Sequence, residues 1–127
     1  MYKVISTDKA PLPQAHYSQG VVAGDLYFSP GLIAIDPKTQ ELKFGSIEEE
    51  ITTIMENLGA YLEAAGSGYD KIVKANITLT DLKDSPVVNE VYARYITENL
   101  PGRMIVQVPA MAGGAHVCLE VVAYCGE

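Results

Sequence analysis

The stretch from Ser46 to Ala65 carries the strongest structural signal in this chain, that of a long amphipathic helix. Ser46-Ile47-Glu48-Glu49 fits a capping box, in which the first and fourth residues bond each other's backbone amides. Apolar residues then recur at helical spacing: Ile47, Ile51, Ile54, Met55, Leu58, Tyr61, Leu62 and Ala65. The polar residues between them, Glu50 included, are expected to face away, and Gly66-Ser67-Gly68 ends the helix. A helix of about five turns with one apolar side must pack against another element.

Before this helix, the sequence favours extended structure interrupted by turns. Tyr2 to Ser6 predicts a first strand, and the two prolines in residues 8–15 predict a loop. From His16 to Ser29, two runs typical of strands flank Gly24-Asp25, which predicts a β-hairpin. Pro30-Gly31 ends the second run, and we expect extended structure to resume over the next four residues, across a β-bulge.

After the helix, a strand, a second helix and two more strands are predicted. Lys71 to Thr80 alternates between apolar and polar residues, which is typical of a half-buried strand. Its apolar side consists of Val73, Ala75, Ile77 and Leu79. The second helix has Ser85 at its N-cap and Pro86 as its first residue. Its apolar stripe consists of Val88, Val91, Tyr92, Tyr95 and Ile96. The last two strands lie between Leu100 and Glu127, joined by a loop of small residues.

This order of elements predicts one α+β domain over residues 1–127, a mixed β-sheet covered on one face by two helices. In the last strand, Val117, Leu119, Val121 and Ala123 would pack beneath the helices. His116, Cys118, Glu120, Val122 and Tyr124 would lie on the uncovered face. With Ile105, that face would expose a sizeable apolar area, which indicates a partner. We therefore expect a homo-oligomer that buries this face.

Charge and cysteine content exclude several classes of function. The net charge is −7, which makes nucleic acid an unlikely partner because its phosphates are bound by clustered basic residues. No apolar run approaches the roughly 20 residues of a membrane span, so we expect no membrane contact. Cys118 and Cys125 are too far apart on one extended strand to pair. Free thiols indicate a reducing compartment, the cytoplasm or, as an alternative, the mitochondrial matrix.

Two charged residues are the main candidates for chemistry. Glu120 lies within an apolar run, so it is either partly desolvated, which suits a general acid or base, or paired with a cation. The alternative is an exposed strand acid or an interface salt bridge. Arg103 follows Pro101-Gly102 at the start of a strand, and its planar guanidinium suits a carboxylate, although a surface arginine is the alternative. Tyr17 could donate a hydrogen bond to a ligand, or could simply belong to the core or an interface.

Other kinds of site find little support. His16 and His116 are the only histidines and are too sparse for zinc, so we expect no metal site. No phosphate-binding glycine loop and no serine nucleophile motif is present. Cys118 could act as a nucleophile only beside an activating base. His116, two residues away, would lie on the same face of the strand as Cys118.

Several sequence blocks resemble the RidA-type proteins of the YjgF/YER057c/UK114 family. These blocks are Ala10-Pro11 with Tyr17-Ser18-Gln19-Gly20, Ser29-Pro30-Gly31-Leu32-Ile33, Val88-Asn89-Glu90-Val91-Tyr92, Pro101-Gly102-Arg103 and Cys118-Leu119-Glu120-Val121-Val122-Ala123. The resemblance implies a chorismate-mutase-like fold, assembled as a homotrimer whose sheets form an inner barrel, with ligand sites in clefts between subunits. It also implies hydrolysis of reactive 2-imino or enamine acids, such as 2-iminobutanoate and 2-iminopropanoate, to 2-keto acids and ammonia without a cofactor.

The resemblance also assigns expected roles to residues. Arg103 corresponds to the arginine that clamps the substrate carboxylate, and Glu120 to the acid that positions or activates water. The residues expected to contact the ligand are Tyr17, Asn89, Gly31 and Ile105. Met104 and Ile105 stand where common members have a small residue and then, often, cysteine. Pro30 stands where active deaminases usually have serine. Three functions therefore remain open: an imine deaminase, a non-catalytic trimer that binds small carboxylates, favoured by Pro30, and an endoribonuclease, which the net charge disfavours.

Overall fold

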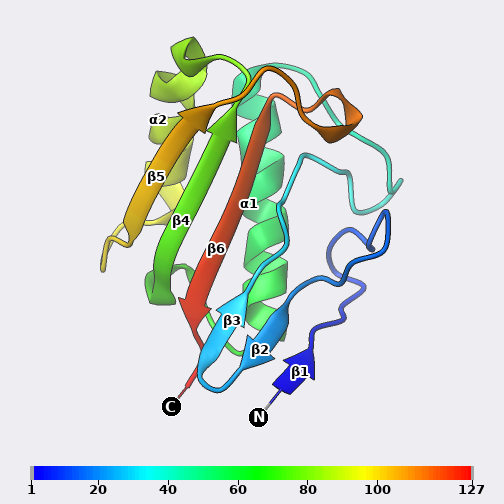
Figure 1. Ribbon diagram of the computed structural model, residues 1–127, viewed down its shortest axis with the longest axis vertical. Helices are drawn as coiled ribbons and strands as arrows, with labels where there is room; N and C mark the ends of the chain where they lie inside the picture. Colours follow the sequence, from blue (N-terminus) through cyan, green and yellow to red (C-terminus); the bar gives the residue numbers. More distant parts are fainter. Residues whose placement is uncertain (1, 127) are drawn as a thin grey trace.

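Both helices pack against one face of a six-stranded mixed sheet in the computed structural model, which describes residues 2–126 (Figure 1). The elements are β1 (Tyr2–Val4), β2 (Val21–Ala23), β3 (Leu26–Phe28), α1 (Ile47–Ala64), β4 (Ile72–Leu79), α2 (Ser85–Tyr95), β5 (Gly102–Gln107) and β6 (Val117–Tyr124). The strand order is β1-β2-β3-β6-β4-β5, and only the β4–β5 pair is parallel. The predicted α+β fold class is confirmed.

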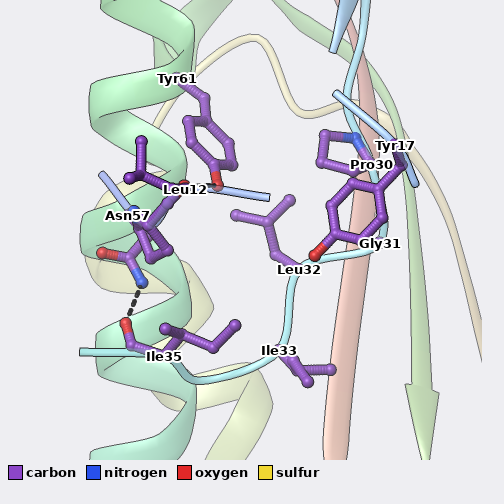
Figure 2. A pocket seen from close by; sticks show the side chains of 10 residues that line it. Leu12, Tyr17, Pro30, Gly31, Leu32, Ile33, Ile35, Asn57 and Tyr61 are labelled. Atoms are coloured by element: carbon purple, nitrogen blue, oxygen red, sulfur yellow. Dashed lines mark hydrogen bonds between the residues drawn. The ribbon is translucent and has the colours of Figure 1, made fainter. Parts of the chain in front are cut away.

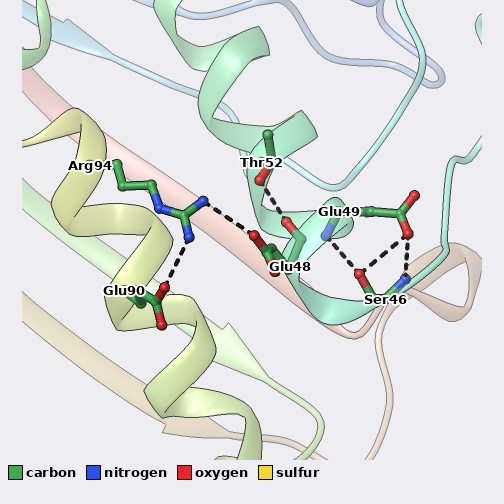
Figure 3. Close-up of polar contacts among 6 residues, drawn as sticks. All are labelled: Ser46, Glu48, Glu49, Thr52, Glu90 and Arg94. Atoms are coloured by element: carbon green, nitrogen blue, oxygen red, sulfur yellow. Dashed lines mark hydrogen bonds and ion pairs between the residues drawn. The ribbon is translucent and has the colours of Figure 1, made fainter.

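The predicted capping box and apolar stripe of α1 are confirmed. Ser46 Oγ accepts a bond from the Glu49 amide at 3.1 Å, and Glu49 Oε1 accepts one from the Ser46 amide at 3.4 Å (Figure 3). On α2, Arg94 bonds Glu48 of α1 at 3.3 Å and Glu90 of its own helix at 2.9 Å (Figure 3). These exposed ion pairs add little stability, so the helices are held mainly by their buried apolar sides. Ile51, Ile54, Met55, Leu58 and Leu62 are fully buried.

Glu50 does not face away from the core as expected; it is 1% exposed. Its carboxylate accepts bonds from the backbone amides of His116 at 2.8 Å and Val117 at 3.0 Å, and it contacts His116 Nδ1 at 2.9 Å. The helical pattern missed this because β6 begins beside the first turn of α1, and its unpaired amides need an acceptor there.

Two local predictions require correction. Val73 was expected on the buried side of β4, but a β-bulge between Ile72 and Lys74 leaves Val73 49% exposed and buries Ile72 instead. Ser85 is not the N-cap of α2 but its first residue. A 3₁₀ turn, Leu82–Asp84 (η2), runs directly into the helix and starts it one residue early.

The face of the sheet that the helices leave uncovered is largely apolar, as predicted. We call it the open face, and its exposed apolar side chains include Phe28 of β3 and Met104 and Val106 of β5. Ile105 was expected there, but it pairs with Ile77 and packs against the buried core on the helix side. Within residues 2–126, no helix combines the length and apolar character needed to cross a membrane.

Candidate active site

Glu120 lies on the open face of β6 with its carboxylate exposed. Asn76 stands directly opposite it on β4, and Asn76 Nδ2 donates a hydrogen bond to Glu120 Oε1 at 3.1 Å. Lys74 and Ser29 line the same hollow of ≈ 150 Å³, but Lys74 forms no ion pair with Glu120. Within residues 2–126, Glu120 matches the expected alternative of an exposed strand acid, since it is exposed and forms no ion pair. One carboxylate oxygen is held by the amide, and the other is free to accept a proton from water.

The predicted bulge after β3 is confirmed, and it lies opposite Glu120. The Ser29 amide donates to Val121 O at 3.0 Å, and Leu32 exchanges two backbone bonds with Leu119, at 2.7 and 3.0 Å. Pro30 and Gly31 therefore leave the ladder between these pairs. Ser29 Oγ holds the bulge, because it accepts a bond from the Val121 amide and donates one to Pro30 O, each at 2.8 Å.

Tyr17 lies beside this bulge, with its ring next to Pro30 and Gly31 (Figure 2). Its hydroxyl accepts a bond from the Gln14 amide at 3.2 Å. A hollow of ≈ 440 Å³ opens on this side of the molecule. The residues that line it are Tyr17, Pro30, Gly31, Ile33, Met111, Ala112 and Cys118. We call this hollow the side cavity.

Gly31 allows the bulge to lie close over β6. A Cβ atom on Gly31 would lie 3.1 Å from Cys118 Sγ, which is tighter than an ordinary van der Waals contact. Tyr17 and Gly31, two of the expected ligand residues, line the side cavity, and the bulge that contains Gly31 lies opposite Glu120. Together these three residues form what we call the acid half-site.

Gln19 holds the loop that carries Tyr17, a role that the sequence analysis missed. Gln19 is 2% exposed. Its Oε1 accepts a hydrogen bond from the Thr7 amide at 2.6 Å, and its Nε2 donates one to the Thr7 carbonyl at 2.9 Å. It also donates to Pro11 O at 2.7 Å, and Tyr61 Oη donates to the same carbonyl at 2.8 Å. The available signal was the pair of prolines in residues 8–15, which removes backbone donors and leaves carbonyls that need side-chain partners.

Cys118 is not arranged as a nucleophile. Burial, with a contribution from the Glu120 carboxylate, raises the pKa of Cys118 to about 11, so it is a neutral thiol near pH 7. His116 was expected on the same face, but it precedes β6 and its ring contacts Glu50 on the helix side. The expectation that His116 shares a face with Cys118 is therefore wrong.

Arg103 lies on the other side of the sheet. It pairs with the buried Ala75, so its side chain points toward the helices, and its guanidinium carbon lies 5.0 Å from the centre of the Tyr92 ring. Burial raises the pKa of Tyr92, and the nearby Arg103 offsets part of that rise. Asn89 is exposed on α2 one turn before Tyr92, and Ile105 follows Arg103 on the same side of β5. We call Arg103, Asn89 and Ile105 the cation half-site.

The two half-sites do not meet within one chain. Glu120 and Arg103 project from opposite faces of the sheet and lie two strands apart, about 10 Å between backbones. No change of rotamer can carry a side chain through a sheet. Each chain therefore presents one acid half-site and one cation half-site at separate places. Among residues 2–126, no group of three or more His, Cys, Asp or Glu side chains is placed to hold a metal ion.

Comparisons with known proteins place nearly the whole chain in one family. The model of the family described as endoribonuclease L-PSP matches residues 7–125. A RutC family protein of Pyrococcus horikoshii is 40% identical, over 98% of both chains. A rat protein named 2-iminobutanoate/2-iminopropanoate deaminase is 39% identical, over 98% of this chain and 90% of its own.

Solved structures give the same result. A putative endoribonuclease of Thermotoga maritima has a TM-score of 0.95 and 38% identity, covering 100% of both chains. RidA from an Antarctic Psychrobacter has a TM-score of 0.92 and 39% identity, covering 96% of this chain and 98% of its own. The E. coli protein TdcF, solved with bound serine, has a TM-score of 0.91 and 31% identity, covering 98% of this chain and 99% of its own.

Proposed function

Because this chain belongs to the endoribonuclease L-PSP family, which includes the RidA and RutC proteins, we propose that it hydrolyses reactive 2-imino acids to 2-keto acids and ammonia. The observation that carries this proposal is the exposed Glu120 carboxylate, held through one oxygen by Asn76 and facing the Pro30-Gly31 bulge. Relatives from rat, mouse and human that are named 2-iminobutanoate/2-iminopropanoate deaminases support it.

The proposed reaction needs one acid–base group and one cation. Arg103 binds the substrate carboxylate. Glu120 takes a proton from a water molecule while the water oxygen bonds to the imine carbon. The π electrons of the C=N bond move to nitrogen. Glu120 then returns the proton to this nitrogen, and the C–N bond breaks as an electron pair on the hydroxyl oxygen forms the C=O bond of the 2-keto acid. Glu120 accepts the hydroxyl proton and passes it to the departing ammonia, which leaves as ammonium. A protonated imine is already electrophilic, so orientation supplies most of the remaining rate.

We propose that two copies of the chain supply the two halves of each site. The separation of Glu120 from Arg103 within one chain supports this arrangement, because a ligand bound at one half-site needs the other half from a neighbour. The apolar open face, which includes Met104 and Val106, supports an assembly buried through the sheets. A trimer with the sheets inside is the form that we propose.

A non-catalytic carboxylate-binding protein is the second candidate function. Pro30 favours it, because proline contributes neither an amide donor nor a hydroxyl beside Glu120. The only hydroxyl at the start of the bulge, that of Ser29, is already bonded to Val121 N and Pro30 O.

The deciding experiment generates 2-iminopropanoate or 2-iminobutanoate in situ and follows its decay with and without the protein. We expect clear acceleration over the reaction with water. Arg103→Ala should lower kcat/KM by about 100-fold or more, because charged hydrogen bonds to the carboxylate are lost. Arg94→Ala is the matched control, since this exposed arginine binds only Glu48 and Glu90.

Each outcome separates the candidates. Ligand binding without acceleration would favour the carboxylate-binding function. Full activity and binding in Arg103→Ala would show that the proposed clamp is wrong. A parallel assay with single-stranded RNA tests the activity that gives the family its description; we expect no cleavage because of the net charge of −7.

A further inference from the structure

The side cavity is lined in part by the Pro30-Gly31 bulge, whereas Glu120 lines a separate hollow with Ser29 and Lys74. The floor of the side cavity is Cys118, which lies on the same face as Glu120 and about 7 Å before it. Tyr17 and the Pro30-Gly31 bulge form one wall, and the bulge also faces Glu120. Because Cys118 and Glu120 are only two residues apart on this face, an acid held at Glu120 can reach the side cavity with a side chain of several carbons.

The lining of the side cavity is uncharged and mainly apolar. Ile33, Met111 and Ala112 contribute only apolar atoms, while the polar side-chain groups are the Tyr17 hydroxyl and the Cys118 thiol. The thiol stays neutral near pH 7 because burial raises the pKa of Cys118 to about 11. A charged ligand group would lose its hydration here without gaining an ionic partner, whereas methylene groups would be favourably buried.

Both walls are held from inside the fold, so the side cavity does not depend on the ligand to form. Gln19 fixes the loop that carries Tyr17 through three hydrogen bonds of 2.6 to 2.9 Å. Glu50 fixes the end of the loop that carries Met111 and Ala112, through the amides of His116 and Val117. A preformed apolar pocket selects ligands by length and polarity at little ordering cost.

We propose, on the basis of the proposed function, that the side cavity is the subsite for the substrate side chain and that Met111 determines its specificity. The preferred substrates are 2-imino acids whose side chains are uncharged, apolar and longer than ethyl. Imines with an acidic or basic side chain are poor substrates. Each added methylene that enters the side cavity raises kcat/KM about threefold to fivefold.

The test compares imines with methyl, ethyl and butyl side chains and with a carboxyethyl side chain, each generated in situ. The expected kcat/KM rises from methyl to butyl by about 30-fold to 100-fold and is lowest for the carboxyethyl imine. Met111→Lys has similar length but adds a charge, so it should abolish the butyl-to-methyl preference and improve the carboxyethyl imine. Met111→Leu, an apolar replacement of similar volume, should keep the butyl-to-methyl ratio above one.

Binding of the matching 2-keto acids, measured by calorimetry, separates this inference from the proposed function. The same order of affinity, methyl below ethyl below butyl, supports the subsite even when no imine is hydrolysed. Imine hydrolysis with no dependence on side-chain length, in either kcat/KM or keto-acid affinity, would overturn the subsite. The proposed deaminase function would still stand. A folded Met111→Lys variant, verified by circular dichroism, that keeps the wild-type preference would overturn the role of Met111.

Discussion

At the scale of single residues, the environment of Glu120 depends on one cross-strand neighbour. Asn76 occupies the paired position on β4 and donates to Glu120 Oε1 at 3.1 Å, while Asn76 Oδ1 is buried and has no partner within residues 2–126. The hydrogen bond from Asn76 Nδ2 favours one orientation of the Glu120 carboxylate. We therefore regard Asn76 as a positioning residue for Glu120.

Asn76→Ala is expected to lower kcat for imine hydrolysis by about tenfold with little change in KM, because Glu120 loses its orientation while the carboxylate clamp remains. Steady-state kinetics with 2-iminobutanoate measure both constants. Thr78→Ala is the matched control, since Thr78 lies on the same face of β4 opposite Cys118 rather than Glu120. A rise in KM at unchanged kcat would contradict the positioning role.

At the scale of elements, two buried polar side chains hold the loops around the site. Gln19 donates hydrogen bonds to backbone carbonyls of the proline-containing loop before β2. Glu50 on α1 accepts hydrogen bonds from the backbone amides where β6 begins. Both side chains are almost fully buried. Such groups are tolerated in a core only when their hydrogen bonds are complete. Removal of one such side chain leaves its buried partners without a hydrogen bond.

Glu50→Ala is expected to lower the free energy of unfolding by about 2 to 4 kcal/mol, because two buried amides lose their acceptor and a void remains. Urea unfolding followed by circular dichroism measures this change. Glu63→Ala, on the same helix but in an exposed pair with Lys9, should change stability by less than about 0.5 kcal/mol. Equal effects of the two substitutions would show that the buried carboxylate is not structurally important.

At the scale of the whole molecule, the important feature is the division of the candidate site between two faces of one sheet. The acid half-site opens on the face that the helices leave bare, and the cation half-site lies at the β5 edge beside α2. The oligomer that we propose would bring these surfaces together where one chain cannot.

This arrangement predicts complementation between inactive variants. Glu120→Gln and Arg103→Ala should each be inactive alone, but a co-expressed equal mixture should recover about a quarter of the wild-type activity. Each site in a mixed oligomer draws one half-site from each of two subunits, and each half is intact in half of the subunits. Activity assays on the mixture, with oligomeric state from light scattering, check this. A mixed oligomer without recovered activity would place both residues in one subunit's site.

Local patterns in the sequence determined the elements and their order, because capping and periodicity act between residues close along the chain. The capped helix α1, the apolar stripe of α2 and the β2–β3 hairpin were all predicted in this way. So was the bulge at Pro30-Gly31, since proline and glycine interrupt a strand ladder wherever it lies.

The tertiary structure decided which side chains share a face and what they contact. Ile105 and Val73 changed faces because parallel register and a β-bulge, which no local pattern encodes, set their orientation. Glu50 and Gln19 became internal anchors because distant backbone groups required partners. Glu120 and Arg103 were predicted from residue chemistry, but their placement on opposite faces follows from the pairing of three strands distant in sequence.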